Sequence, residues 1–415
     1  MKKNRLQLFI GAISLVAVTA LLTFTASLLW FTNTSLGRQD YYIAFDRNEV
    51  KAENVEKFRK VKTILENYYY EDVDGNILLE GAIDGMARAL GDPYTVYLPR
   101  DEMKLFTERT SGSYVGIGVT VNTGNDGILT VVECYENSPA EAAGIKAGDK
   151  IVRVDGKDVT TIKDSDLIIS MIKGEENTIV NITVFRPSEG RQITMEVVRK
   201  KINIINVSSK ILDGGIGYLR IKMFDQNVSQ YFGEHLDRLL KSGIRALIID
   251  VRDNPGGSYD QVVKIIDRIV PEGIIVYTED RAGKRTVEKS DSRELNIPLA
   301  VLINENSASA SEILAGAIKD HGKGILVGNK TFGKGLVQIV ITLDDGSGIK
   351  LTTSRYFTPS GVCIQGIGIE PDIEEKLDEK YKYYPVSQIP EEDDTQLLRA
   401  IQVLNKISSG SLIFV

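Results

Sequence analysis

The sequence has few of the residues on which metal sites, disulfide scaffolds and histidine-dependent active sites are built. Its 415 residues include only two histidines and two cysteines. Cys134 and Cys363 lie far apart and outside any Cys-x-x-Cys spacing, so we interpret both as free thiols. The net charge is −7 and no block of like charges runs along the chain, which argues against a nucleic-acid partner.

The two histidines do not fit a catalytic triad, which needs an imidazole as its base. His235 falls in a polar helical pattern, and His321 follows a predicted helix, where a solvated C-terminal cap is expected. Neither GNSGG nor GxSxG occurs, which excludes the trypsin-like and α/β-hydrolase arrangements. Residues 322–324 lack the spacing of a phosphate loop, so we expect no metal, nucleotide or other cofactor.

One long apolar run stands at the N-terminus. Lys2, Lys3 and Arg5 precede residues 8–31, which carry no charge. As a helix of about 1.5 Å per residue, this run would cover roughly 36 Å, enough to cross a hydrocarbon core of about 30 Å. No clean small-x-small site follows, so we expect a retained anchor rather than a cleaved signal. The basic flank predicts a cytoplasmic N-terminus and an extracytoplasmic remainder.

The rest of the chain changes its pattern twice, and its hydrophobic share of 42% is enough for folded cores. Helical periodicity dominates at first, and a turn at Asp92-Pro93 is interpreted as a packing element. Short β-rich runs follow at 115–121, 129–132, 150–154, 178–185 and 192–198, with a helical stretch at 164–172.

Beyond residue 200, strands and helices alternate, which predicts an α/β core. The expected strands are 216–221, 246–251 and 299–303, and the expected helices are 230–240, 260–269, 310–318 and 396–407. We therefore divide the chain into a stub with its anchor (1–38), a helical region (39–110), a β-rich domain (111–199), an α/β domain (200–380) and a helical tail (381–415).

The β-rich domain opens on a segment in which two glycines leave backbone N–H groups free to face a carboxylate, although an ordinary tight turn would also explain them. That segment is Tyr114, Val115, Gly116, Ile117 and Gly118. With the later Asn-Ser-Pro-Ala, Ala-Gly-Ile and Ala-Gly-Asp motifs of residues 137–149, it resembles a PDZ domain. Such a domain binds a chain end as an added strand. Ile117, Leu167 and Met171 are candidate pocket walls, and for the last two a place in the core is an equal alternative.

A hydroxyl-rich turn at 304–312 separates an apolar strand from a helix, and a helix N-terminus stabilises developing negative charge. The alternative is a serine N-cap followed by a glutamate. Downstream, glycines flank Lys334 among apolar residues. Burial can lower a lysine pKa from about 10.4 by as much as roughly 3 to 5 units, which would make Lys334 a workable base rather than a surface lysine. Gln338, four positions on, could orient the amine.

The motifs Ser-Ala-Ser-Ala-Ser-Glu at 307–312 and Thr-Phe-Gly-Lys-Gly-x-x-Gln at 331–338, with the upstream PDZ pattern, resemble the carboxyl-terminal processing peptidases, or tail-specific proteases. The resemblance implies an α/β peptidase core of the ClpP/crotonase-like spiral type, an inserted PDZ domain and a helical N-terminal region. It makes Ser309 the nucleophile, Lys334 the base and Gln338 the residue that positions it. It also implies that the Asp-Asn-Pro-Gly-Gly turn of residues 253–257 offers the Gly257 N–H, beside that of Ala310, to an oxyanion.

The same resemblance implies substrates with apolar C-termini, gating by the PDZ domain and homodimerisation through helical terminal regions. The chain departs from the family at Val362 and Cys363, where a basic residue and a serine are usual, and at Asp253, where asparagine is common. Two alternatives remain: a catalytically silent PDZ scaffold at the membrane, and acyl chemistry on a small thioester. The intact Ser309, Lys334 and Gln338 speak against the first, and the PDZ domain speaks against the second.

Overall fold

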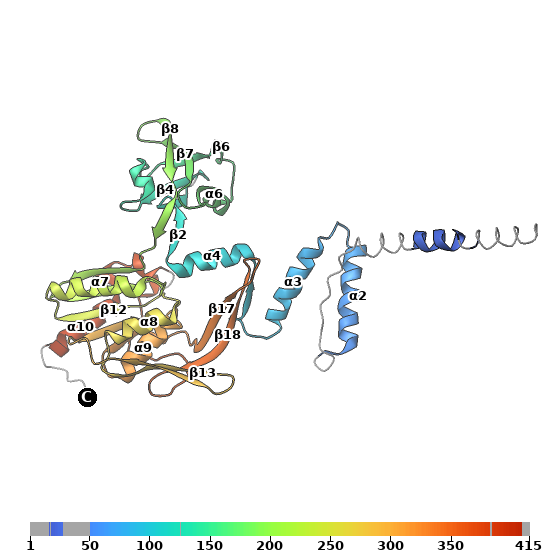
Figure 1. Cartoon of the computed structure of the whole chain (residues 1–415). Coiled ribbons are helices and arrows are strands. Elements are labelled where there is room, and N and C mark those ends of the chain that lie inside the picture. The colour runs from blue at the N-terminus through green and yellow to red at the C-terminus, as the bar shows by residue number, and fades with distance from the viewer. Residues whose placement is uncertain (1–15, 17, 28–49, 125, 382–383, 409–415) are drawn as a thin grey trace, which may run out of the picture. The chain divides into compact units, whose positions relative to one another are not determined.

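The computed structural model describes residues 16, 18–27, 50–124, 126–381 and 384–408 (Figure 1). Most of the apolar run predicted at 8–31 lies outside these residues. Among the described residues, none of the helices has the length and apolar character needed to cross a membrane. The chain divides into two compact units, residues 1–81 and 82–415.

The N-terminal unit contains α2 (Ala52–Tyr68) and the start of α3 (Gly75–Arg88), as the helical periodicity predicted. The described residues of α2 include no buried side chain. Phe58, Val61 and Ile64 repeat at helical spacing and are about half exposed. This helix therefore presents an apolar stripe that the described residues of its own unit leave about half exposed.

A mostly parallel sheet forms the centre of the second unit. Its strands, in spatial order, are β10 (Val207–Leu212), β11 (Ile216–Ile221), β12 (Ala246–Asp250), β15 (Leu299–Ile303), β16 (Ile325–Gly328) and β19 (Ile373–Glu374). Only β10 is antiparallel to its neighbour. Strand β15 is apolar throughout, β12 is apolar up to its last residue, and β11 is interrupted only by Arg220, because both faces of the sheet are covered.

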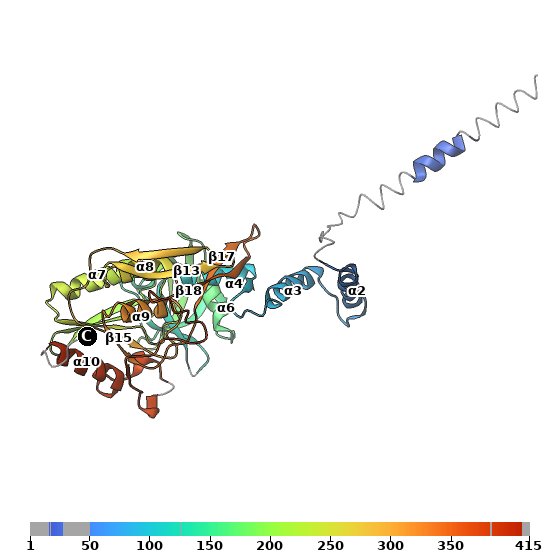
Figure 2. The ribbon, with the colours of Figure 1, turned by 90° about the horizontal axis from the view of Figure 1, so that it is seen from below.

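Alternate residues of β12 enter different cores. Leu247 and Ile249 pack with α7 (Val228–Lys241), α8 (Tyr259–Asp267) and α9 (Ala310–Asp320), whereas Ala246 and Ile248 pack with α10 (Thr395–Ser408). Figure 2 shows α8 and α10 on opposite sides of β15. Three short 3-10 turns precede α10, at Glu379–Tyr381, Val386–Gln388 and Glu391–Asp393. The helix predicted at 396–407 thus completes the α/β core.

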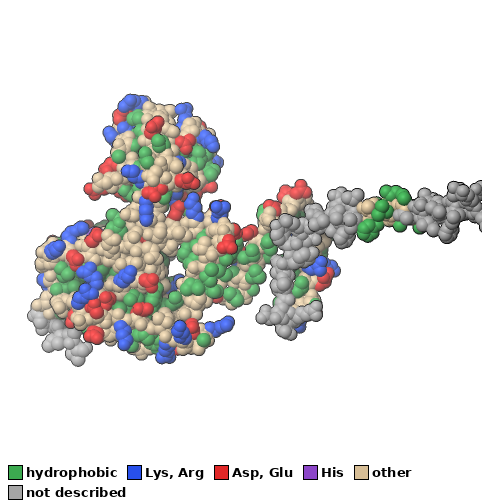
Figure 3. Space-filling model, viewed as in Figure 1, with side chains coloured by type: hydrophobic (Ala, Val, Ile, Leu, Met, Phe, Trp, Pro, Cys, Tyr) green, Lys and Arg blue, Asp and Glu red, His purple; other side chains and the backbone are tan. Residues whose placement is uncertain are grey.

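A second sheet lies beside the first. Its strands are β1 (Val96–Leu98), β18 (Gly348–Phe357), β13 (Gly273–Asp280) and β14 (Arg285–Ser290), with β17 (Leu336–Thr342) along the other edge of β18. Helix α4 (Arg100–Ser111) follows β1 directly. Ile339, Ile341 and Leu343 are exposed along the β17–β18 hairpin, and Figure 3 shows hydrophobic side chains gathered there.

The PDZ domain is inserted through a two-stranded ribbon of β2 (Ser113–Gly116) and β9 (Lys200–Asn203). Its sheet runs β3 (Val119–Thr123), β4 (Leu129–Cys134), β5 (Lys150–Val154), β7 (Ile179–Arg186) and β8 (Arg191–Val198), and β6 (Lys157–Asp158) pairs with β5. The helices are α5 (Pro139–Ala142) and α6 (Ser165–Ile172). The single strand predicted at 115–121 is wrong, because Gly118, at φ 79°, separates β2 from β3.

Candidate active site

Two turns meet at the carboxyl edge of the central sheet, because β12 and β15 are parallel neighbours. Residues 251–258 follow β12, and residues 304–309 follow β15. The Ala308 N–H donates to the Asn254 carbonyl at 3.0 Å, and the Ser307 hydroxyl donates to the Val251 carbonyl at 2.8 Å. These bonds join the Gly-Gly turn to the turn that carries Ser309.

Ser309 is the N-cap residue of α9 and has φ 54° and ψ −112°. Positive φ is uncommon for a residue with a Cβ atom, and such strain often marks a functional site. Gly256, at φ 100°, passes so close that an added Cβ atom would lie 2.8 Å from the Ser309 Cβ. Glycine at this position therefore permits the two turns to meet.

Glu312 connects the turn of Ser309 to the loop of Lys334. Its buried carboxylate accepts hydrogen bonds from the Ser309 N–H at 2.8 Å and from the Lys334 N–H at 2.9 Å through Oε2. Oε1 accepts from the Gly333 N–H at 2.7 Å and from the Thr331 hydroxyl at 2.6 Å. The serine N-cap followed by a glutamate, the alternative expected from sequence, is present, but this glutamate also bonds to the backbone of both the proposed nucleophile and the proposed base.

Lys334 is half-buried at the cavity. Burial, followed by the positive charge of Lys350, lowers the pKa of its amine below the ordinary lysine value, while Glu312 and Asp92 act in the opposite direction. Its Nζ lies 4.7 Å from the centroid of the Tyr94 ring. In the described part of the chain, no hydrogen bond joins this amine to the Ser309 hydroxyl.

Gln338 lies on β17 with its side chain half-buried in the same cavity. Its amide nitrogen donates to the Thr352 hydroxyl at 3.3 Å. The arrangement brings Gln338 to the site but pairs it with a neighbouring strand.

Two backbone N–H groups at the cavity are the ones expected from the sequence to face an oxyanion. Gly257 and Ala310 both line the cavity, and their N–H groups have no acceptor among the residues that the structure describes. Gly257 has φ 140°, and an added Cβ atom would lie 2.2 Å from the Phe224 carbonyl oxygen. The bond from the Ser258 N–H to that oxygen holds the turn in place.

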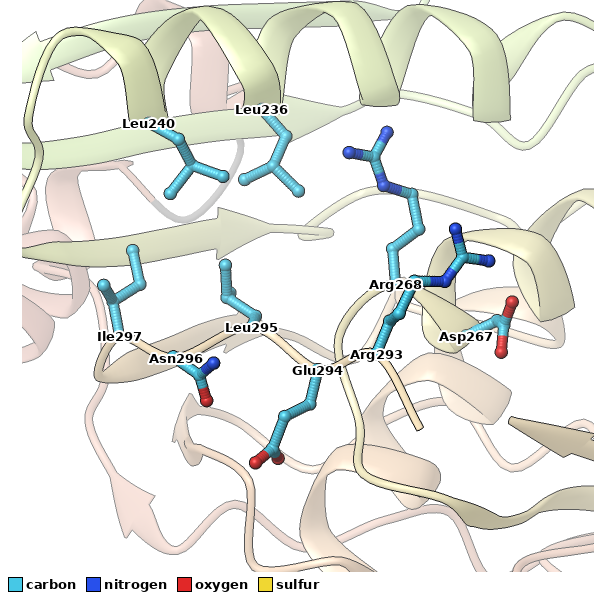
Figure 4. Close-up of a pocket in the computed structure, with 9 residues that line it drawn as sticks. All are labelled: Leu236, Leu240, Asp267, Arg268, Arg293, Glu294, Leu295, Asn296 and Ile297. Atoms are coloured by element: carbon cyan, nitrogen blue, oxygen red, sulfur yellow. The ribbon is translucent and has the colours of Figure 1, made fainter. Parts of the chain in front are cut away.

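The cavity measures about 560 Å³, and Ser309, Lys334, Gln338 and the Gly-Gly turn all line it. A second cavity of about 580 Å³ lies between α7 and residues 293–297 (Figure 4). Its arginines, Arg268 and Arg293, pair with aspartates, and Leu236 and Leu295 supply apolar walls. It presents no hydroxyl or lysine, so the chemistry points to the first cavity.

The two histidines lie away from both cavities. His235 bonds to the Ser209 hydroxyl at 2.7 Å, and burial lowers its pKa. His321 is the C-cap of α9 as predicted, but its Nε2 lies 2.8 Å from the Ile274 carbonyl, so the expectation of a solvated imidazole is wrong.

A buried ionic cluster around Arg252 lies directly before the Gly-Gly turn. Arg252 is fully buried and pairs with Asp250 at 2.7 Å and with Asp394 at 2.8 Å. It also donates to the Gln396 amide oxygen at 3.0 Å. Asp253 follows at φ 59°, a conformation that aspartate tolerates. Burial acts to raise the pKa of its carboxyl, but hydrogen bonds from Asn306 and Asn304 outweigh burial, so the pKa is lowered.

The PDZ residues divide between core and surface. Ile117 is 2% exposed, Met171 packs against the PDZ core, and Leu167 is 50% exposed on α6. The β2 segment that carries Tyr114, Val115 and Gly116 pairs with β9. In the order of this sheet, β3 and β8 are the two edge strands, and β3 is the one that follows Gly118.

The structure brings residues to the site that sequence reasoning missed. Tyr94 comes from the turn interpreted as packing, and the Tyr356 hydroxyl lies 2.6 Å from the Lys334 carbonyl. Gln365, in the segment that departs from the family pattern, accepts from the Gly335 N–H at 2.8 Å. Of the residues that surround Ser309 and Lys334, only Glu312 could be expected from the local sequence, because a glutamate three positions after a serine N-cap is a common helix start.

Comparisons with known proteins agree with this architecture. Residues 215–375 match the model of peptidase family S41, residues 113–198 match the PDZ domain, and residues 16–102 match the N-terminal domain of the activating protease CtpB. A probable CtpA-like serine protease of Staphylococcus aureus (strain N315) is 36% identical over 369 residues, covering 86% of this chain and 72% of that protein. One from Staphylococcus haemolyticus (strain JCSC1435) is 34% identical over 368 residues with the same coverage.

Among solved structures, a photosystem II D1 C-terminal processing protease is 32% identical, covers 77% of this chain and 86% of its own, and has a TM-score of 0.46. The fold and the relatives define the class: a serine protease that carries a PDZ domain. More narrowly, the chain belongs to peptidase family S41, among the carboxyl-terminal processing peptidases.

Proposed function

We propose that this chain is a membrane-anchored endopeptidase that cleaves peptide bonds with a Ser309/Lys334 dyad. The observation that carries the proposal is one cavity lined by a serine at a helix N-terminus, a lysine with a lowered pKa and two unused N–H groups. A neutral amine can accept the serine proton, and preorganised N–H groups stabilise the oxyanion.

In the proposed reaction, the Ser309 Oγ attacks the substrate carbonyl carbon while its proton passes to the Lys334 Nζ. The N–H groups of Gly257 and Ala310 donate to the oxyanion. As the C–N bond breaks, Lys334 returns the proton to the leaving amine, and water then hydrolyses the ester on Ser309. The Lys334 amine must turn toward the hydroxyl, since catalytic hydrogen bonds often tighten only with substrate. We assign Gln338 to orient it there.

We further infer that substrates are proteins with apolar C-termini, bound as an added strand on the open edge of β3. Residues 8–31 would anchor the chain in a membrane, with the N-terminus cytoplasmic and the protease domain extracytoplasmic. The uncovered apolar stripe of α2 favours a homodimer through the helical N-terminal region.

The dyad is tested with the full-length chain in detergent and an unfolded protein that ends in an apolar tail. We expect Ser309→Ala and Lys334→Met to abolish cleavage while tail binding persists. Wild-type cleavage by Lys334→Met would show that the assigned base is wrong. A wild-type protein that bound the tail without cleaving it would favour the scaffold alternative.

The role of the PDZ domain is tested by replacing residues 113–203 with a short Gly-Ser linker. The flanking residues are adjacent, since the Ile204 N–H donates to the Gly112 carbonyl at 2.8 Å. We expect the preference for an apolar over an acidic tail to disappear and the rate on a short reporter peptide to change. An unchanged reporter rate would rule out gating.

A further inference from the structure

Tyr94 is held beside the proposed base by contacts that fix its turn on β18. The Asp92 carboxylate accepts from the Tyr94 N–H at 3.0 Å and from the Thr95 hydroxyl at 2.7 Å. The Thr352 N–H in turn donates to the Thr95 hydroxyl at 3.1 Å. Because β1 then pairs with β18, a structured element holds the ring beside the Lys334 amine.

The Tyr94 ring and the Lys334 amine form a cation–π pair with 4.7 Å between Nζ and the ring centroid. This attraction acts within about 6 Å and requires a positive charge, so it favours the protonated amine over the neutral one. A neutral amine, which is the form that a base needs, gains almost nothing from the ring face. The contact therefore competes with the chemistry that the dyad must perform.

We propose that Tyr94 is a positioning residue for the general base: its ring holds the protonated Lys334 amine at one side of the cavity and withholds it from Ser309 until the proton is lost. This inference rests on the proposed role of Lys334. The other charged groups around the amine are Lys350 on β18, Glu312 on α9 and Asp92 in the Tyr94 turn.

The matched substitutions are Tyr94→Leu, which keeps an apolar side chain but removes the ring face, and Tyr94→Phe, which keeps the ring. The measurement is kcat/KM on a short reporter peptide from about pH 6 to pH 10, where a perturbed lysine titrates. Without the ring, the amine loses its proton at lower pH. We expect Tyr94→Leu to be roughly two- to fivefold faster than wild type on the acid limb and equal to it at the plateau.

Tyr94→Phe should follow the wild-type profile along the whole limb. Tyr94→Trp, which offers a stronger cation–π face, should be slower on the acid limb, and it decides the matter if Tyr94→Leu does not fold. Two results would overturn the proposal: a Tyr94→Leu acid limb that matches wild type, or a shift of the acid limb in Tyr94→Phe as large as that in Tyr94→Leu. In either case packing alone would explain the contact.

Lys334→Met separates this inference from the proposed function. If that variant cleaves at the wild-type rate, the base is misassigned and both ideas fail. If Lys334→Met is inactive, and Tyr94→Leu has the same acid limb as wild type, only the proposed role of Tyr94 is wrong.

Discussion

Replacing Glu312 by glutamine tests whether one buried carboxylate aligns the two halves of the site. Its oxygens accept four hydrogen bonds, from Ser309, Lys334, Gly333 and Thr331. A glutamine side chain keeps one acceptor oxygen and has an NH₂ group in place of the second carboxylate oxygen. The two donors that bonded to that second oxygen would face another donor, so two of the four hydrogen bonds are lost. A bond to a charged group contributes about 1.5 to 3 kcal/mol, and relief from burying the charge offsets part of the loss.

We therefore expect Glu312→Gln to lower the free energy of unfolding by about 3 kcal/mol. A displacement of about 1 Å between Ser309 and Lys334 would lower kcat by roughly a hundredfold. Urea unfolding followed by circular dichroism, together with kcat and KM on a reporter peptide, measures both effects. The matched control is Glu305→Gln, an exposed glutamate in the turn that precedes α9, which should stay within about 0.5 kcal/mol of wild type. Wild-type stability and kcat in Glu312→Gln would refute the alignment role.

Two further substitutions probe the electrostatics and the oxyanion turn. Lys350→Met removes a positive charge that lowers the pKa of Lys334, so this pKa should rise. If the neutral amine is the proposed base, the acid limb of kcat/KM should then move to higher pH. Lys350→Arg should leave the limb in place, and a shift of the Lys350→Met limb to lower pH would contradict the reasoning. Gly257→Ala would place a Cβ atom 2.2 Å from the Phe224 carbonyl oxygen and so displace the turn. We expect kcat to fall by about a hundred- to a thousandfold while substrate binding is retained. A loss of kcat below tenfold would mean that the Gly257 N–H is not an oxyanion donor.

The central sheet was predictable because strands that are buried on both faces have mostly apolar sequences. The strands expected at 216–221, 246–251 and 299–303 are found as β11, β12 and β15, with one residue of difference at the end of β12. Their runs are apolar almost throughout, with Arg220 of β11 as an interruption, and turn residues bound them, so local pattern and tertiary environment agree. Helix α6, expected at 164–172, begins one residue later because the Asp164 side chain caps it.

The second sheet was not predictable in the same way. Strand β17 exposes Ile339 and Ile341, and β18 exposes or half-buries most of its length, so neither has a clear two-residue alternation. The pairing of β18 with β1 is also distant in sequence, as between Lys350 and Val96. Tyr94 reaches Lys334 next to this non-local pairing, and Glu312 bonds to a loop that begins 19 residues after it, so the motifs indicated Lys334 but not its surroundings.

The buried cluster around Arg252 has a consequence for biosynthesis. The guanidinium is balanced by Asp250, its near neighbour, and by Asp394, which is made 142 residues later and precedes α10. A buried arginine that lacks one of its two carboxylates is poorly compensated, so we expect the turn that follows it to be set only after Asp394 and α10 have been made. The N–H groups proposed to bind the oxyanion would then be aligned late in folding, and the proposed protease would stay inactive until α10 has docked.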